Sequence, residues 1–282
     1  MACRFCGTRP VAQGRCAKCF VRFFERRVAT TIREQQLLKK TDRILVAASG
    51  GKDSLATIHV LKKFSYDVHA LAVDEGIAGY REHTLRDLKT YCDAHAVPLK
   101  IVRFSDEGRT LDEELRLKPA HPCSVCGVRR RNAINAGAKG YDVVATGHNA
   151  DDEAQAVLMN LVRANTQLFA RQGPATGSPK GWFVQRVKPL YFLTEKEVMT
   201  YALLEKLPVS FHECPYAHES LRAQIRDALN EYAAHRPGAK TRVLENYLVL
   251  KRRLKVDAER LRLCERCGEP ASAPVCRSCA KI

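Results

Sequence analysis

The segment Ser49-Gly50-Gly51-Lys52-Asp53-Ser54 has the composition of a phosphate-binding loop. It directly follows the apolar run 44–48, and the apolar residues after it recur at helical spacing, so we predict a buried strand that turns into a helix. Gly50 and Gly51 allow the backbone to approach an anion, and the start of a helix offers free N–H groups to phosphate. Lys52 adds a point charge. The spacing is not that of the Walker pattern.

Two quartets of cysteines have the spacing of metal ligands. Four thiolates saturate a tetrahedral zinc ion, so we predict a closed, structural zinc finger at each end of the chain. Disulfide or redox Cys-x-x-Cys pairs are the alternative. The predicted zinc ligands are Cys3, Cys6, Cys16 and Cys19 near the N-terminus and Cys264, Cys267, Cys276 and Cys279 near the C-terminus.

Three further cysteines, Cys123, Cys126 and Cys214, form an incomplete ligand set. Three protein ligands leave one coordination position open, which is the arrangement of a metal centre that meets a substrate. Cys92 is left over and lies in an apolar pattern with helical spacing, so we predict that it is a buried core residue.

Alternating strands and helices should position these groups. Apolar runs that alternate with helical patterns predict an α/β fold with a doubly wound parallel sheet. Ligands of such sheets bind beyond the carboxyl ends of the strands, where we expect the loops 49–54 and 147–152 to meet near Asp74. The predicted strands are residues 44–48, 68–73, 99–104 and 142–146.

We expect further helices in the centre of the chain and next to each zinc finger. Pro119 and Pro122 should break the chain just before Cys123, which would then precede a helix. A linker helix at 20–40 should join the first finger to the core, and the pattern beyond residue 216 is helical. We therefore predict an N-terminal zinc finger (1–24), a catalytic domain with a basic linker helix (25–215), a C-terminal helical region (216–260) and a C-terminal zinc finger (261–282).

The chain is strongly basic, with 47 lysines and arginines against 31 acidic residues and a net charge of +16. This suggests a polyanionic partner, and basic clusters on the linker helix and before the second finger favour contact with a nucleic-acid backbone. We find no signal peptide and no apolar run long enough to span a bilayer, so we expect a cytosolic protein without a membrane partner. The basic clusters comprise Arg22, Arg26, Arg27, Arg33, Lys39 and Lys40, and Lys251, Arg252, Arg253, Lys255, Arg260 and Arg262.

Taken together, these residues resemble the two-zinc-finger tRNA 2-thiouridine synthetases, which belong to the PP-loop ATP pyrophosphatases. The resemblance covers essentially the whole length and rests on SGGKDS, both fingers and the three central cysteines. It implies a Rossmann-like PP-loop fold and an ATP-dependent tRNA uridine 2-sulfurtransferase. Further matching motifs are Gly76-Ile77, Pro122–Gly127, Thr146–Asp152, Arg171–Pro174, Val187–Leu190 and Glu213–Tyr216.

The resemblance implies that ATP lies on Ala48–Ser54, with the adenine against the main chain near Ala72 and with Gly147 in the same pocket. The enzyme would adenylate O2 of a uridine, and sulfur would then displace AMP at C2. Mg²⁺ and Lys52 would offset the charge that develops on the phosphates.

Two carboxylates are candidates for binding Mg²⁺ or for orienting the base. These are Asp53, next to the lysine of the loop, and Asp152, in the later loop. Helix capping is the competing role for Asp151 and Asp152, and we expect one of the two to be a capping residue.

In the resembling family the three central cysteines carry a [4Fe–4S] cluster whose fourth iron lacks a protein ligand. Cys123, Cys126 and Cys214 match these positions, so hydrosulfide could bind there as the nucleophile. The alternative is a cysteine persulfide that a second cysteine resolves, since both chemistries use the same thiolates.

Arg130 departs from one branch of the family. The enzymes that act on ribothymidine carry a lysine four residues after the second cluster cysteine, where this chain has Arg130. Arginine stays charged near neutral pH, so we expect it to position phosphate or uridine and not to transfer protons. The motifs 127–131 and 149–152 look more like the branch that acts on wobble uridine 34. Position 54 is the alternative target.

The resemblance also implies tRNA as partner, a ubiquitin-like thiocarboxylate protein as sulfur carrier, and possible homodimers. Two other functions compete. A PP-loop ligase of other chemistry would leave the three central cysteines unexplained. A zinc-finger RNA-binding protein without catalysis would leave the complete SGGKDS unexplained.

Overall fold

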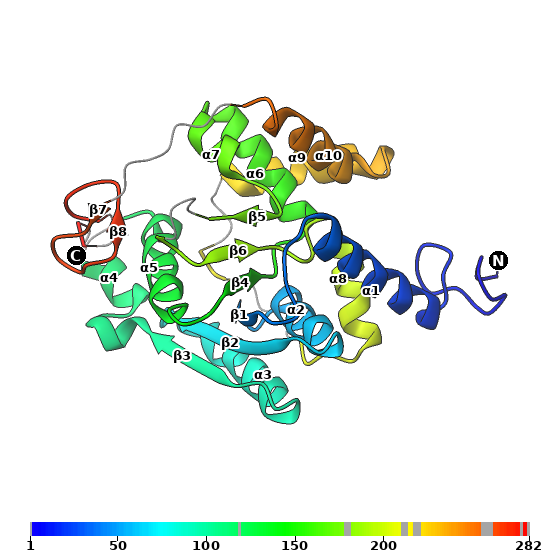
Figure 1. Cartoon of the computed structure of the whole chain (residues 1–282), viewed down its shortest axis with the longest axis horizontal. Coiled ribbons are helices and arrows are strands. Elements are labelled where there is room, and N and C mark those ends of the chain that lie inside the picture. Colours follow the sequence, from blue (N-terminus) through cyan, green and yellow to red (C-terminus); the bar gives the residue numbers. More distant parts are fainter. Residues whose placement is uncertain are drawn as a thin grey trace.

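The structure is a computed structural model that describes residues 2–117, 120–177, 182–209, 214–216, 221–254, 262–276 and 279–280. A six-stranded sheet in the order β3-β2-β1-β4-β6-β5 forms its centre (Figure 1). All neighbours are parallel except β5, which pairs antiparallel with β6 at the edge. This confirms the doubly wound, mostly parallel sheet. The strands are β1 (Arg43–Ala47), β2 (Asp67–Asp74), β3 (Leu99–Arg103), β4 (Val143–Thr146), β5 (Ala175–Thr176) and β6 (Gln185–Val187).

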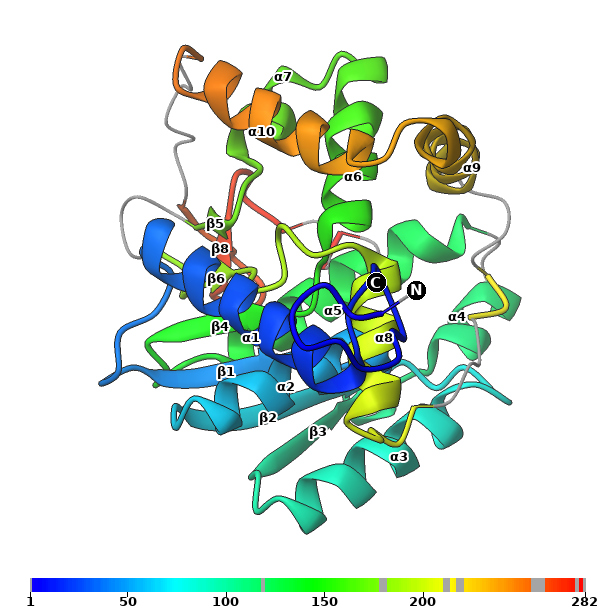
Figure 2. The same ribbon diagram turned by 90° about the vertical axis from the view of Figure 1, so that its right-hand side faces the viewer.

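Helices cover both faces of this sheet (Figures 1 and 2). The predicted helix after each of the first four strands is present, whereas the short β5 and β6 and the helices α7 and α8 were not predicted. The helices are α1 (Ala17–Glu34), α2 (Lys52–Lys63), α3 (Arg81–Ala94), α4 (Leu111–Leu117), α5 (Pro122–Gly137), α6 (Ala150–Val162), α7 (Thr166–Arg171), α8 (Glu195–Leu204), α9 (Leu221–His235) and α10 (Ala239–Lys251), with a 3-10 turn η1 (Phe104–Glu107).

Residues along β1, β2, β3 and β4 alternate between two apolar cores, as the period of a strand requires. Ile44 and Val46 of β1 belong to a core shared with α1, α2, α3 and α8, whereas Leu45 belongs to a core shared with α4 and α5. Cys92 is 1% exposed in the first core, which confirms its predicted burial. A third core joins α6, α9 and α10 around Tyr191.

The order of the strands reverses between β1 and β4, so the loops that follow these two strands meet at the carboxyl edge. The helix α5 begins at Pro122 because proline is tolerated in the first turn, where its missing N–H has no helical partner. Cys123 and Cys126 therefore lie inside the first turns of α5. The prediction that Cys123 precedes the helix was wrong.

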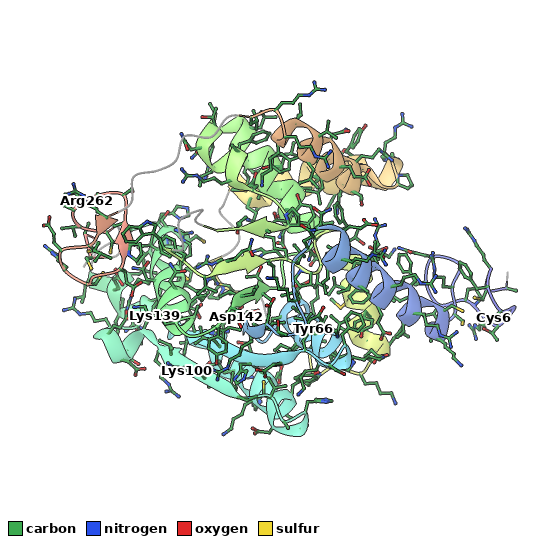
Figure 3. All side chains as sticks on the ribbon, in the orientation of Figure 1. Cys6, Tyr66, Lys100, Lys139, Asp142 and Arg262 are labelled. Atoms are coloured by element: carbon green, nitrogen blue, oxygen red, sulfur yellow. The ribbon has the colours of Figure 1, made fainter. Side chains whose placement is uncertain are left out.

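The two cysteine quartets lie at opposite ends of the longest axis of the molecule (Figure 1). Figure 3 marks these ends by Cys6 and by Arg262. The C-terminal quartet surrounds a small hairpin of β7 (Arg262–Leu263) and β8 (Pro270–Ala271). The helix α1 runs from the N-terminal quartet to the sheet and crosses the boundary predicted at residue 24. Among the described residues, none of the helices has both the length and the apolar composition needed to cross a membrane.

Candidate active site

The predicted phosphate-binding loop forms the turn between β1 and α2. Gly50 has a φ of +84°, and a Cβ atom there would lie 2.1 Å from the carbonyl oxygen of Thr84 in α3, so the turn requires glycine. Gly51 is the N-cap of α2. The Ser54 hydroxyl accepts a hydrogen bond from the Gly50 N–H at 3.1 Å and donates to the Gly51 carbonyl at 2.9 Å. The positive end of α2 thus lies in the loop, where it would attract phosphate.

Lys52 lies between two carboxylates. Its Nζ atom is 3.0 Å from Asp53 and 2.8 Å from Glu195, the first residue of α8. Burial works against the ammonium charge, but the two carboxylates outweigh it and raise the pKa of Lys52. Partial burial raises the pKa of Asp53, although Lys52 opposes that shift. Lys52 therefore stays charged at neutral pH, as contact with phosphates requires.

The loop after β4 contacts the phosphate-binding loop directly. A Cβ atom on Gly147 would lie 2.7 Å from the Asp53 carbonyl carbon and 2.8 Å from the Ser54 nitrogen. The Asn149 Nδ2 atom donates to Asp53 Oδ1 at 2.9 Å. The structure thus brings Gly147 and Asp53 together, as expected for two loops at one edge of the sheet.

Asn149 also begins α6. Its side-chain oxygen accepts the N–H groups of Asp151 and Asp152, at 2.9 and 3.2 Å. Asp152 Oδ2 accepts the Asn149 N–H at 3.2 Å, which completes a capping box, while Oδ1 lies 3.4 Å from Arg222. Burial raises the pKa of Asp152. The capping residue is thus Asp152, the one proposed for Mg²⁺, and its second oxygen faces a cation.

Asp151 is a structural carboxylate. It is 5% exposed, accepts the Glu195 N–H at 2.9 Å and pairs with Lys240 of α10. It therefore ties α6 to α8 and to α10, whereas Asp152 lies near enough to Asp53 that its charge helps to raise the pKa of Asp53.

The expected adenine position lies along β2. Ala72 is fully buried, and its pairing partner is Ile101 of β3. The pairing of β1 with β2 ends at Leu71, whose carbonyl accepts the Ala48 N–H at 2.8 Å. Beyond that point β1 has turned into the phosphate-binding loop, so the main chain at Ala72 lies next to the start of the loop.

The three central cysteines approach one another from α5 and from the segment 214–216. Cys123 Sγ contacts the Tyr216 carbonyl at 3.6 Å. Cys126 and Cys214 pack against the same apolar core. Burial raises the pKa of Cys126 to about 11 and also raises that of Cys214, and the Arg130 charge opposes both shifts. Such thiols would need a bound metal to be thiolates at neutral pH.

The spacing of these cysteines differs from that of a zinc site. Within the described parts of the chain, only the two terminal quartets bring three or more ligand atoms to within 4.8 Å of one another. A four-iron cluster is larger than a single ion and holds its thiolates further apart. Three soft sulfur ligands that are not gathered around one point therefore fit an iron–sulfur cluster better than a single zinc ion.

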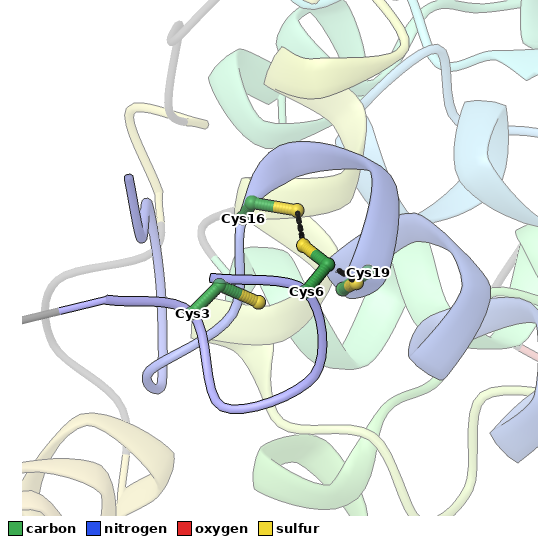
Figure 4. A group of neighbouring side chains, drawn as sticks. All are labelled: Cys3, Cys6, Cys16 and Cys19. Atoms are coloured by element: carbon green, nitrogen blue, oxygen red, sulfur yellow. Dashed lines mark hydrogen bonds between the residues drawn. The ribbon is translucent and has the colours of Figure 1, made fainter. Parts of the chain in front are cut away.

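Both terminal quartets fit zinc. Tetrahedral Zn–S bonds of about 2.3 Å place sulfur atoms about 3.8 Å apart. The Sγ atoms of Cys6 and Cys16 lie 3.5 Å apart and those of Cys6 and Cys19 lie 3.7 Å apart (Figure 4). Cys267 and Cys276 are also 3.7 Å apart. All eight predicted ligands belong to these two groups.

The basic clusters are only partly available to a polyanion. Arg22, Arg26 and Arg33 are exposed on α1. The helix ends at Glu34, so Lys39 and Lys40 follow it. Lys251 instead turns inward and donates to the Gln172 carbonyl, and Arg252 and Arg253 are exposed after it. Lys255 and Arg260 lie outside the described residues.

Four site residues were not predicted from the sequence. Glu195 reaches Lys52 and Arg222 reaches Asp152 from helices far along the chain. Glu75 and Arg81 form a buried ion pair beneath the loop at 2.8 Å. The sequence carried one usable signal, the family motif at Gly76-Ile77, which lies between these two residues.

Comparisons with known proteins agree with this geometry. Residues 22–233 match the model of the PP-loop domain family. The tRNA-5-methyluridine(54) 2-sulfurtransferase of Pyrococcus horikoshii is 38% identical over 99% of this chain and 93% of its own. The cytoplasmic tRNA 2-thiolation protein 1 of Chlamydomonas reinhardtii is 36% identical over 97% and 80%.

A solved structure is similar over the whole chain. It is the U34-tRNA thiolase NcsA from Methanococcus maripaludis with its [4Fe-4S] cluster. It covers 100% of this chain and 95% of its own with a TM-score of 0.85 and 32% identity. Identity at this level over entire chains goes beyond a shared fold. With its ATP-binding loop and its cysteine sets, the chain belongs to the PP-loop tRNA 2-thiolation sulfurtransferases.

Proposed function

We propose that this enzyme adenylates O2 of a tRNA uridine and then replaces that oxygen by sulfur. O2 attacks the α-phosphorus of ATP, and the bond to the β-phosphate oxygen breaks, so pyrophosphate leaves. Hydrosulfide then adds to C2, the C2–O2 bond breaks and AMP leaves with the former O2, while the proton of the hydrosulfide replaces the N3 proton that was lost on adenylation. The proposal rests on the observation that the ATP loop and the cysteine helix α5 are connected through a short chain of contacts. Arg130, one turn after Cys126, lies 3.7 Å from Glu75, whose partner Arg81 contacts the loop.

The loop residues would act on the phosphates. The N–H groups at the start of α2 and the Lys52 ammonium would hold the leaving pyrophosphate. Asp53 and Asp152 would bind Mg²⁺, which would release their partners Lys52 and Arg222 toward the nucleotide. Arg130 would position phosphate or uridine between the loop and the cysteines.

Cys123, Cys126 and Cys214 would hold the [4Fe–4S] cluster. Bound by three thiolates, such a cluster offers one iron without a protein ligand, which supplies a place for the sulfur nucleophile. The apolar packing of Cys126 and Cys214 would keep water from the adenylated base. A persulfide on one of these cysteines is the competing chemistry.

We propose uridine 34 as the target. The similar U34 thiolase NcsA covers the whole chain, and Arg130 departs from the lysine of the ribothymidine-type enzymes. The relative from Pyrococcus horikoshii, named for position 54, makes that uridine the alternative. The exposed arginines on α1 and after α10 would contact the tRNA backbone. We also propose that a thiocarboxylated carrier protein donates the sulfur and that the enzyme forms a homodimer. A cytosolic location is part of the proposal, in line with the name of the Chlamydomonas relative.

The test is anaerobic incubation of unmodified tRNA with the iron-reconstituted protein, ATP, Mg²⁺ and sulfide, followed by nucleoside mass spectrometry and RNase mapping. We expect 2-thiouridine at position 34 and its loss in Cys214→Ala. Cys92→Ala, which removes a cysteine from the core and not from the site, should retain activity. ATP turnover without any thiolated nucleoside, even with a thiocarboxylated carrier and native hypomodified tRNA, would refute the sulfurtransferase proposal.

A further inference from the structure

A buried ion pair lies directly beneath the ATP loop. Arg81, the first residue of α3, and Glu75, just after β2, are each 4% exposed. Their Nε and Oε2 atoms are 2.8 Å apart without the alignment of a hydrogen bond, so charge holds the pair together. Burying two charges costs desolvation free energy, so such a pair adds little to stability. We therefore look for its role in the geometry that it imposes on the residues around it.

The Arg81 guanidinium connects three segments of the chain. Its Nη1 atom donates to the Ser49 carbonyl at 2.7 Å and to the Thr84 hydroxyl at 2.9 Å, and Nη2 donates to the Val73 carbonyl. The same turn of α3 approaches the loop a second time, because the Thr84 carbonyl oxygen is only 2.1 Å from the position that a Cβ atom on Gly50 would take. The first turn of α3 therefore packs directly against the ATP loop and supports it.

The second oxygen of Glu75 faces the other half of the site. Oε1 lies 3.7 Å from Arg130 Nη1, and the Arg130 side chain is 52% exposed. Arg130 follows Cys126 by four residues on α5, so both lie on the same side of that helix. One carboxylate thus contacts the arginine that supports the ATP loop and the arginine beside the cysteines.

We propose that Glu75 and Arg81 are the positioning pair that aligns the ATP loop with Arg130 and the cysteine helix. Arg81 fixes the loop by holding the Ser49 carbonyl, and Glu75 fixes the Arg130 guanidinium between the nucleotide and the cysteines. The role of Arg81 makes a prediction about ATP affinity only, so it does not depend on the thiolation reaction. The part that concerns Glu75 rests on the proposed sulfurtransferase function.

The first test compares two buried arginines. Arg129 also binds backbone carbonyls, those of Phe104 and Arg109, and pairs with Glu114 at 2.9 Å, but it does not contact the loop. Arg81→Lys and Arg129→Lys each remove a buried guanidinium and should lower the unfolding temperature similarly. Only Arg81→Lys should raise the equilibrium Kd for ATP, by about tenfold or more, because a charge-assisted bond to the loop is lost.

Equal ATP affinities of Arg81→Lys and Arg129→Lys would overturn the role of Arg81. If Arg81→Lys does not fold, Thr84→Val replaces it, since this nearly isosteric change removes only the hydroxyl that Arg81 contacts. We then expect a rise in Kd of about threefold. An unchanged Kd in Thr84→Val would contradict the proposal in the same way.

The second test is a double-mutant cycle of Glu75→Gln and Arg130→Gln in the thiolation assay. Each change should lower kcat by about tenfold to a hundredfold through misplacement of the guanidinium. If Glu75 acts through Arg130, the double variant should be no slower than the slower single variant. Effects that multiply would overturn this link. A wild-type protein that binds ATP but forms no thiouridine would refute the proposed function and leave the Arg81 result standing.

Discussion

Gly50 and Gly51 are adjacent glycines, but the fold needs only the first. Gly50 combines a φ of +84° with a neighbouring carbonyl 2.1 Å from the position of a Cβ atom. Left-handed strain of about 1–2 kcal/mol and overpacking of about 1–3 kcal/mol predict that Gly50→Ala destabilises the protein by about 2–5 kcal/mol. At roughly 2 °C per kcal/mol for a chain of this size, the unfolding temperature should fall by about 4–10 °C.

Gly51→Ala is the matched control. A Cβ atom at Gly51 would meet only the Ser49 hydroxyl, at 3.5 Å, so stability should change by only about 0.5 kcal/mol. Its ATP affinity should nevertheless fall by about tenfold or more, because the methyl group would occupy space that the phosphate needs next to the backbone. Circular dichroism melts and calorimetric titration with ATP measure both effects. Wild-type stability of Gly50→Ala, or wild-type ATP affinity of Gly51→Ala, would refute this division of roles.

Three further predictions concern metal, pH and a buried pair. Cys264→Ser should lower the zinc content measured by mass spectrometry from two ions per chain to one, with no loss in the Cys92→Ser control. Because burial raises the pKa of Asp53, its carboxylate in the metal-free protein should protonate at a higher pH than an exposed aspartate does, and an NMR titration in which Asp53 stays fully ionised down to about pH 4 would contradict this. Lys188→Met should leave Glu153 buried without its partner at 2.7 Å and cost about 3–5 kcal/mol in urea unfolding, whereas adding Glu153→Leu should restore most of that stability.

The strands near the ATP loop were predictable because their apolar runs are short and end at glycine or polar residues. The predicted strand 44–48 compares with β1 at Arg43–Ala47, and 142–146 with β4 at Val143–Thr146. The short β6 was missed because its three residues, Gln185–Val187, are too few to show a period. Pro122 was misinterpreted because proline disrupts a helix interior but is favoured in its first turn.

The candidate site was predictable where neighbours in sequence are neighbours in space. The loop 49–54 and the cysteine quartets are of this kind. Glu195 is 143 residues from its partner Lys52, and nothing local to Glu195 indicates that contact. The sequence also could not decide which of Asp151 and Asp152 caps α6, because both closely follow the N-cap Asn149. The structure decides it, since Asp151 is turned inward to bind the N–H group at the start of α8.

The positions of the two fingers at opposite ends of the long axis have a mechanical consequence. Two widely separated contact points restrain the tilt of an elongated partner far more than two adjacent points do, because the same slip at either contact then produces a smaller angular error. Under the proposed function, fingers that each touch the tRNA would therefore restrain the angle at which it meets the site residues between them. Damage to one finger should then broaden the choice of uridine before it abolishes binding.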